Sequence, residues 1–183
     1  MPNAAMHRDE LVETAMRLFR RQGFASTGLQ QILAESGAPK GSLYHYFPGG
    51  KEELGAAAVT LAGQRVRDML DGLAKRHEEP QAFVRGYCRV MSNWMAESEF
   101  RSGCPIATTL LENAPQSPAI TRAGLDAVDS WIDVAAEVFG RVERPPRAAR
   151  TRAQLLVAAV EGALILARLR QSRQPILDVA RLF

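Results

Sequence analysis

A short run of polar and aromatic side chains near the N-terminus is well suited to contact a nucleic acid. Leu43 and Phe47 are spaced i, i+4 and can face a core, which leaves a group of residues for solvent or a partner: Lys40, Gly41, Ser42, Tyr44, His45 and Tyr46. Lysine can donate to guanine O6 and N7, and serine can pair with several base edges. Tyrosine and histidine suit phosphate oxygens, and glycine lets the backbone approach closely. These types favour contacts with DNA.

Three short helices must hold that face, and we expect them at residues 8–22, 27–36 and 39–46. In the first, apolar residues recur at helical spacing and form one stripe: Leu11, Ala15, Leu18 and Phe19. Gly23 and Gly37 are expected to end the first two helices. Two helices joined by a glycine turn, the second with an exposed polar face, form the layout of a helix-turn-helix.

The helix ends supply further candidate phosphate contacts. Thr27 with Gln30 three residues later predicts a capping box that opens the second helix. The hydroxyl and the free N–H groups there would suit a phosphate, so both residues join the predicted DNA-binding set. Pro39 suits the first position of the third helix. Lys51 begins the fourth helix, where its charge opposes the helix dipole and a bound phosphate would relieve that mismatch.

Alternative interpretations exist for the aromatic residues of this face. Tyr44 and Tyr46 could each pack on a neighbouring helix, and His45 could be structural or simply exposed. The DNA-binding hypothesis therefore depends on the whole array.

The stretch from Arg8 to Leu54 resembles the DNA-binding domain of the tetracycline-repressor (TetR) family of bacterial transcriptional regulators. The resemblance lies in the Leu-Tyr-x-x-Phe ending of the recognition helix, here Leu43 to Phe47, and in the first-helix pattern from Ala15 to Phe24. It implies base reading by Lys40, Gly41 and Ser42. It also implies backbone contacts by Thr27, Tyr44, His45 and Lys51.

A longer link between the third and fourth helices narrows the resemblance. Most family members have Phe-x-x-Lys there, whereas this chain has one residue more between Phe47 and Lys51. With Gly103-Cys-Pro105 and Val160-Glu-Gly-Ala-Leu164 further on, the chain resembles the members that respond to lincomycin or flavonoids.

The composition describes an ordinary globular chain. Of 183 residues, 46% are apolar and 23% charged, and the net charge of +3 permits nucleic-acid binding without requiring it. Two cysteines are too few for a disulfide framework, and the N-terminus lacks an apolar signal segment. The most apolar run, 155–167, is too short to span a bilayer, which takes about 20 residues. We expect a cytoplasmic protein that does not enter a membrane.

No strand pattern is present, so we expect an all-α fold of about nine helices. The later helices are expected at 51–76, 80–98, 105–113, 117–140, 147–172 and 175–182. We place a helix-turn-helix domain at 1–50 and a larger helical ligand-binding and dimerisation domain at 51–183. The long helix that opens the second domain could convert a ligand-induced tilt into a change of recognition-helix spacing.

Apolar side chains with a few polar neighbours could line a small-molecule pocket in the second domain. The candidates are Phe83, Tyr87, Met91, Trp94, Ile106 and Leu110. For any single one of them, a position in the ordinary core is the favoured interpretation. Cys104 could be a redox sensor, but this role is disfavoured because no cation or second cysteine stands near it in the sequence.

The apolar run at 155–167 needs more cover than a single copy can supply, which favours a homodimer with two interface helices from each copy. The predicted interface residues are Trp131, Leu155, Ala158, Ala159, Gly162, Ala163 and Leu166. Glu161, inside the same run, is either an interface hydrogen-bonding group or a pocket anchor. Five arginines between 141 and 152 are either part of a solvated loop or a second nucleic-acid patch.

We therefore expect a ligand-responsive repressor that binds a palindromic double-stranded DNA operator as a homodimer and leaves it when a small, mostly apolar or aromatic molecule binds. An activator would share every residue named. A helical enzyme using Cys104 or Glu161 is disfavoured, because His7, His45 and His77 are scattered and no catalytic motif is present. No cofactor or metal is expected.

Overall fold

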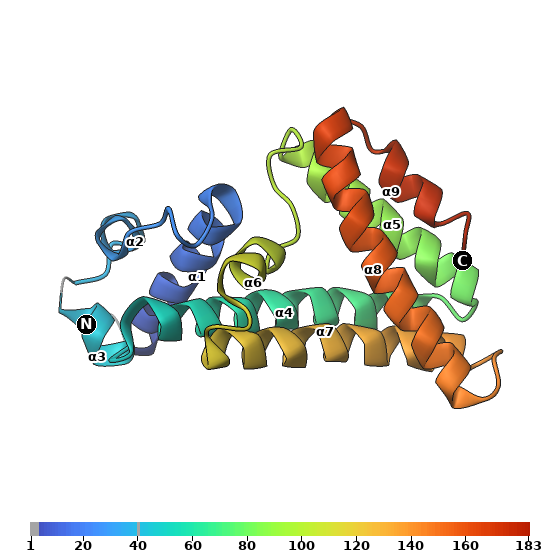
Figure 1. Cartoon of the computed structure of the whole chain (residues 1–183), viewed down its shortest axis with the longest axis horizontal. Coiled ribbons are helices and arrows are strands. Elements are labelled where there is room, and N and C mark those ends of the chain that lie inside the picture. The colour runs from blue at the N-terminus through green and yellow to red at the C-terminus, as the bar shows by residue number, and fades with distance from the viewer. Residues whose placement is uncertain (1–3, 40) are drawn as a thin grey trace. The chain divides into compact units, whose positions relative to one another are not determined.

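A computed structural model describes residues 4–39 and 41–183, and side chains from residue 6 onward within those ranges. All regular structure in these residues is helical (Figure 1). The helices are α1 (Ala4–Gln22), α2 (Leu29–Ser36), α3 (Ser42–Tyr46), α4 (Gly50–Arg76), α5 (Pro80–Glu97), α6 (Ala107–Asn113), α7 (Pro118–Phe139), α8 (Pro146–Arg170) and α9 (Gln174–Val179). The all-α prediction is confirmed. None of these described helices is both long and apolar enough to cross a membrane.

Glycine and proline account for most helix boundaries. Gly23 and Gly37 adopt the left-handed conformation, with φ of +89° and +69°, and end α1 and α2 as expected. The third helix begins later than expected, at Ser42, because Pro39 lies in a turn before the helix. Its carbonyl accepts a bond from the Ser42 N–H at 2.9 Å.

The helices form two compact units. One contains the chain up to Gln64 together with residues 105–127, and the other contains residues 65–104 and 128–183. Helices α4 and α7 contribute residues to both. Contacts thus group α6 with the N-terminal helices, whereas the domain boundary expected after residue 50 assigns all of the later chain to one domain.

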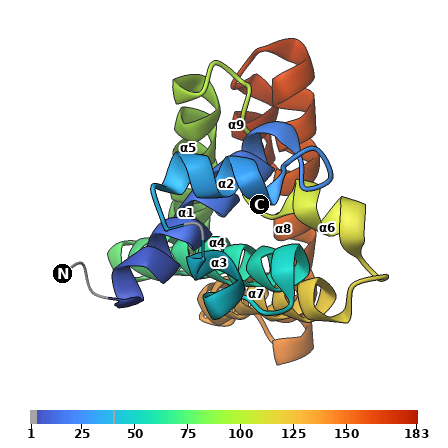
Figure 2. The ribbon, with the colours of Figure 1, turned by 90° about the vertical axis from the view of Figure 1, so that its left-hand side faces the viewer.

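The first unit has a core built from the helix-turn-helix and the start of α4. Helix α1 packs against α2, α3 and α6, and Figure 2 shows α1, α2 and α3 gathered together. The expected stripe of α1 is buried along with the inward residues of the next helices: Leu11, Ala15, Leu18, Phe19, Ile32, Leu33, Leu43, Phe47 and Leu54. At the start of α7, the Ser117 hydroxyl donates to the Glu52 carboxylate of α4.

The second unit packs α5, α8 and α9 against one another (Figure 1). Its largest buried side chains come from α5 and α7: Phe83, Tyr87, Trp131 and Phe139. Helix α8 starts at Pro146 and ends at Arg170. Its C-cap, Gln171, has a φ of +47° and gives the same left-handed stop that glycine gives elsewhere.

Four of the five arginines between 141 and 152 have partners inside this unit. Arg141 donates to the carbonyls of Ala74, His77 and Glu78, and Arg144 donates to those of Gly140 and Glu143. The other two form ion pairs, Arg150 with Asp129 and Asp133, and Arg152 with Glu143. These contacts favour a structural role for the segment over a second nucleic-acid patch.

Candidate nucleic-acid interface

Helix α3 is fixed to the first unit by two apolar side chains. Leu43 and Phe47 are almost completely buried, and the Phe47 N–H donates to the Leu43 carbonyl at 2.7 Å. Five residues are too few for a helix to be stable alone in water, so burial of this pair determines the orientation of α3. The remaining side chains of the helix lie away from the core or at its edge.

The aromatic residues of α3 divide into exposed and packed. Tyr44 is 63% exposed, and His45 is exposed as well. Tyr46 is partly buried against the core of the first unit, with its ring centroid 4.9 Å from that of His45. The packing alternative therefore fits Tyr46, whereas Tyr44 is mostly exposed.

Gly41 and Ser42, two of the predicted base-reading residues, lie at the start of α3. Gly41 is exposed, and Ser42 is partly exposed, with its hydroxyl donating to the Pro39 carbonyl at 2.6 Å. The base-reading role predicted for Lys40 lies outside the described residues. Gln30, in the first turn of α2, is exposed, so its side chain is available to a partner.

The capping box predicted at Thr27 is wrong. Gly28 is the N-cap of α2, without a side-chain cap bond, and Thr27 is completely buried. Its hydroxyl donates to the Gly23 carbonyl at 2.6 Å, because a threonine in a turn can bond to the backbone four residues earlier. The Thr27 hydroxyl therefore stabilises the turn after α1 and is not presented to a phosphate.

Lys51 is half-buried at the start of α4. Its ammonium donates to the Ala25 carbonyl at 3.3 Å and lies 4.5 Å from the centroid of the Phe24 ring. Burial lowers the pKa of Lys51, and the negative charge of Glu112 opposes that shift. The hydrogen bond to the turn uses one of the three N–H donors of this ammonium.

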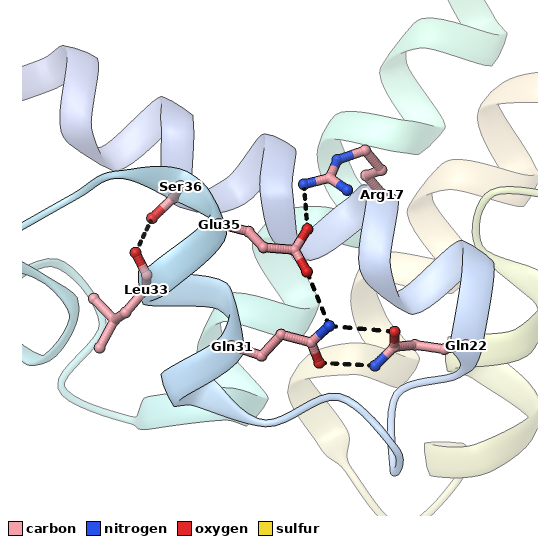
Figure 3. Close-up of polar contacts among 6 residues, drawn as sticks. All are labelled: Arg17, Gln22, Gln31, Leu33, Glu35 and Ser36. Carbon is pink, nitrogen blue, oxygen red and sulfur yellow. Dashed lines mark hydrogen bonds and ion pairs between the residues drawn. The ribbon is translucent and has the colours of Figure 1, made fainter.

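Polar contacts between α1 and α2 fix the helix-turn-helix, and the sequence did not reveal them (Figure 3). The Arg17 guanidinium donates to the Glu35 carboxylate at 2.8 Å, and the Gln31 amide donates to the same carboxylate at 2.9 Å. The side-chain amides of Gln22 and Gln31 form two reciprocal hydrogen bonds, of 2.9 and 3.4 Å. Two hydrogen bonds lower the pKa of Glu35, and the one from Gln31 has a larger effect than the one from Arg17.

The predicted ligand residues do not fall in one unit. Phe83, Tyr87 and Met91 are buried in α5 of the second unit, and Trp94 is partly exposed there. Ile106 and Leu110 belong to the first unit. A hollow of about 620 Å³ in the second unit is lined by none of the six; its lining residues are Ala96, Glu99, Phe100, Arg101, Arg168 and Gln171.

Ionisable groups gather in the interior of the second unit around Tyr87. Burial raises the pKa of Tyr87 well above its ordinary value, and the nearby Glu161 adds to that shift. Burial also raises the pKa of Glu161, while a hydrogen bond with Cys104 opposes it. Glu161 therefore has its neighbours Tyr87 and Cys104 within the same protomer. Burial raises the pKa of the Cys88 thiol to about 11, so this cysteine is not a reactive thiolate.

The predicted dimer residues separate into exposed and buried. Trp131 and Ala163 are buried within the protomer, so they offer no surface to a second copy, and Ala159 is partly exposed. One face of α8 remains uncovered, with residues at helical spacing that we call the α8 stripe: Leu155, Ala158, Gly162, Ile165, Leu166 and Leu169. The other face of α8 packs on α5 and α9.

Comparison with known proteins agrees with this geometry. Residues 11–58 match the family of bacterial regulatory proteins named tetR, and residues 80–182 match the C-terminal domain of LmrA/YxaF-like transcriptional regulators. The protein is thus a helix-turn-helix transcriptional regulator and not an enzyme. It belongs to the TetR family, within the LmrA/YxaF-like group.

Individual relatives cover nearly the whole chain. The HTH-type transcriptional regulator YxaF of Bacillus subtilis is 32% identical over 173 residues, covering 94% of this chain and 91% of its own. LmrA of the same organism is 30% identical and covers 94% and 92%. The crystal structure of the regulatory protein TetR from Rhodobacter sphaeroides aligns with a TM-score of 0.80 at 25% identity, covering 95% of each chain.

Proposed function

We propose that this protein is a cytoplasmic transcriptional repressor that binds a palindromic operator as a homodimer and releases it when a small, mostly apolar or aromatic molecule binds. The observation that carries the DNA-binding part is the exposed face of α3, held to a buried core by Leu43 and Phe47. Tyr44, His45 and Gly41 are exposed there, and Ser42 stands beside them. Such a face serves no purpose in packing.

Within this proposal the two kinds of contact divide by position. Gly41 and Ser42 lie at the start of α3, where a recognition helix enters the major groove, and they read bases. Lys40 is assigned the same base-reading role from the sequence alone. Tyr44, His45, Gln30 and Lys51 contact phosphates, which fix the register of the protein on the duplex without reading sequence. Tyr46 contributes chiefly by packing α3 on its core.

The homodimer is supported by the α8 stripe. Leu155, Ile165, Leu166 and Leu169 are each between 45% and 76% exposed on one face of a helix whose opposite face is buried. A contiguous apolar face of this kind marks an interaction site. A two-fold symmetric copy satisfies it and presents two α3 helices to a palindrome.

The effector response is supported by the interior of the second unit. Phe83, Tyr87, Met91 and Trp94 supply apolar and aromatic surface, and Tyr87 and Glu161 supply polar groups. Apolar lining with a few placed polar groups is what a small-molecule site requires. The other two predicted ligand residues, Ile106 and Leu110, belong to the first unit and are not part of this interior.

An electrophoretic mobility shift with DNA upstream of the protein's own gene tests the proposal. A salt-sensitive, sequence-specific shift that one compound from a set of flavonoids and other planar aromatics releases would support DNA binding, operator and effector class together. A specific shift that no compound releases would reject the proposed effector class. If neither this DNA nor a random-site selection yields a specific sequence, the DNA-binding proposal fails.

The sign of regulation needs a separate readout. In vitro transcription from the shifted DNA, with and without the protein, should show fewer transcripts when the protein is bound. More transcripts would make the protein an activator and contradict the repressor part of the proposal.

A further inference from the structure

The turn between α1 and α2 presents two consecutive N–H groups to a side chain far along the chain. The Phe24 N–H donates to Oε1 of Glu112 at 3.2 Å, and the Ala25 N–H donates to Oε2 of the same carboxylate at 2.5 Å. Each carboxylate oxygen therefore accepts one backbone hydrogen bond. Bonds of this kind to a charged acceptor are among the strong ones in proteins.

Glu112 lies near the end of α6, 88 positions after Phe24 in the chain and inside the same compact unit. Gly23 makes room for its carboxylate, because a Cβ built on Gly23 would come within 2.6 Å of Oε1. The φ of +89° at Gly23 also favours glycine. The turn and Glu112 thus fit each other in both shape and hydrogen bonding.

Lys51 contacts the same turn from α4. Its ammonium donates to the Ala25 carbonyl and lies over the Phe24 ring. The Glu112 carboxylate is close enough to favour the charged form of this lysine. An anion from α6 and a cation from α4 therefore hold the peptide groups around Ala25 from two helices.

We propose that Glu112 is a positioning residue for DNA binding: its carboxylate fixes the turn between α1 and α2, and with it the Lys51 ammonium, from a helix outside the helix-turn-helix. This inference rests on the proposed DNA-binding function. It assigns no DNA contact to Glu112 itself. Without the carboxylate, the two N–H groups would bond to water and the turn would sample other conformations.

A purely electrostatic effect of Glu112 on DNA predicts a change in affinity of the opposite sign. If Glu112 acted on DNA only through its negative charge, it would repel the phosphates, and its neutralisation would tighten binding. A positioning role predicts weaker binding when the carboxylate is removed. The sign of the change in affinity therefore separates the two.

The test compares Glu112→Ala and Glu112→Gln with a matched control, Glu99→Gln. Glu99 is an exposed carboxylate whose charge change is the same and whose ion pair is with Arg101. Amide hydrogen exchange at Phe24 and Ala25, followed by NMR in the free protein, reports on the turn directly. The affinity for DNA obtained by random-site selection reports on function, and circular dichroism confirms that each variant is folded.

In Glu112→Ala, we expect both amides to exchange about tenfold faster and the DNA dissociation constant to rise about tenfold, the scale of one hydrogen bond to a charged group. Glu112→Gln should lie between, because an amide oxygen can still accept, and Glu99→Gln should match the wild type. Unchanged exchange, faster exchange with unchanged affinity, or tighter DNA binding would each overturn the inference. A wild-type protein that binds no DNA would overturn the proposed function instead, while the amide exchange would still report whether Glu112 holds the turn.

Discussion

The Arg17 guanidinium on α1 lies 2.8 Å from the Glu35 carboxylate on α2, and the Gln31 amide donates to that same carboxylate. The Arg17–Glu35 contact links α1 to α2, and the Gln31 bond orients the carboxylate within α2. Because Glu35 is exposed, we expect Glu35→Gln to weaken DNA binding by less than about fivefold, the range of an exposed ion pair. A titration by fluorescence anisotropy checks this, and a loss of a hundredfold or more would mean that Glu35 does more than orient α2.

The Glu35 carboxylate should also make the stability of the protein depend on pH. The pKa of Glu35 is lowered in the folded protein, so its contribution to stability is present above the ordinary pKa of a glutamate. That contribution is lost as the pH falls through the lowered folded pKa. Thermal unfolding of wild type and Glu35→Gln should therefore differ at neutral pH and converge in acid. A difference that grows as the pH falls would contradict this assignment.

Burial of Leu43 should be essential for α3. We expect Leu43→Ala to lower the free energy of unfolding by about 3 kcal/mol, because it leaves a cavity in the core of the first unit. Chemical denaturation measures this, and DNA binding should fall with it. Tyr44→Ala is the matched surface change in the neighbouring residue, and its unfolding free energy should stay close to that of the wild type.

Tyr44 and Lys40 should differ in what they do to specificity. We expect Tyr44→Ala to raise the dissociation constant about tenfold for every DNA sequence alike, since one bond to a charged phosphate is lost. Lys51→Ala should act in the same uniform way. Lys40→Ala should instead change which sequence is preferred. Random-site selection with each variant checks this, and an unchanged preference for Lys40→Ala would contradict the base-reading assignment.

The helix layout could be predicted from the sequence because its signals are local. Gly23 and Gly37 mark the ends of α1 and α2, because glycine adopts the left-handed conformation readily. The i, i+4 spacing of Leu43 and Phe47 was enough to predict which face of α3 is buried. The capping prediction at Thr27 was wrong because a threonine before a helix can either cap that helix or bond to the backbone of an earlier residue. The geometry of the turn determines which of the two bonds forms. Glu112 could not be found at all, since its partners are 87 and 88 positions away.

The later helices show the same limit for burial. The apolar run of α8 predicts that both faces are covered, but it does not say which face packs inside the protomer. Ala163 therefore proved to be core, and Leu169 proved to be part of an exposed stripe that was not foreseen. Trp131 was also assigned to the interface, whereas a buried site for so large a side chain exists within the second unit.

The α8 stripe should control the oligomeric state. We expect Leu166→Glu to raise the dimer dissociation constant at least about tenfold, because association would bury an unpaired charge. Val142→Glu is the control, a similarly exposed apolar residue in the segment between α7 and α8. Analytical ultracentrifugation over a range of concentrations measures both. A Leu166→Glu protein that dimerises as well as the control would remove the stripe from the interface.

Glu161 should make the protein less stable as the pH rises. Its pKa is raised in the folded protein by burial, so folding favours the protonated form. The associated stability is fully present below the ordinary pKa of a glutamate and is lost as the pH rises through the folded pKa. Glu161→Gln should therefore unfold at a higher temperature than the wild type at neutral pH, and this advantage should shrink in acid. An advantage that does not change with pH would contradict the raised pKa of this carboxyl.

Hydroxyl-radical footprinting on DNA from random-site selection tests whether two copies of α3 read a palindrome. We expect two symmetric protected half-sites with centres about 34–36 Å apart, or a multiple of that spacing. Tyr44→Ala should weaken both half-sites equally. A single unpaired protected site, or protection without any sequence preference, would contradict the binding of a palindrome by two α3 helices.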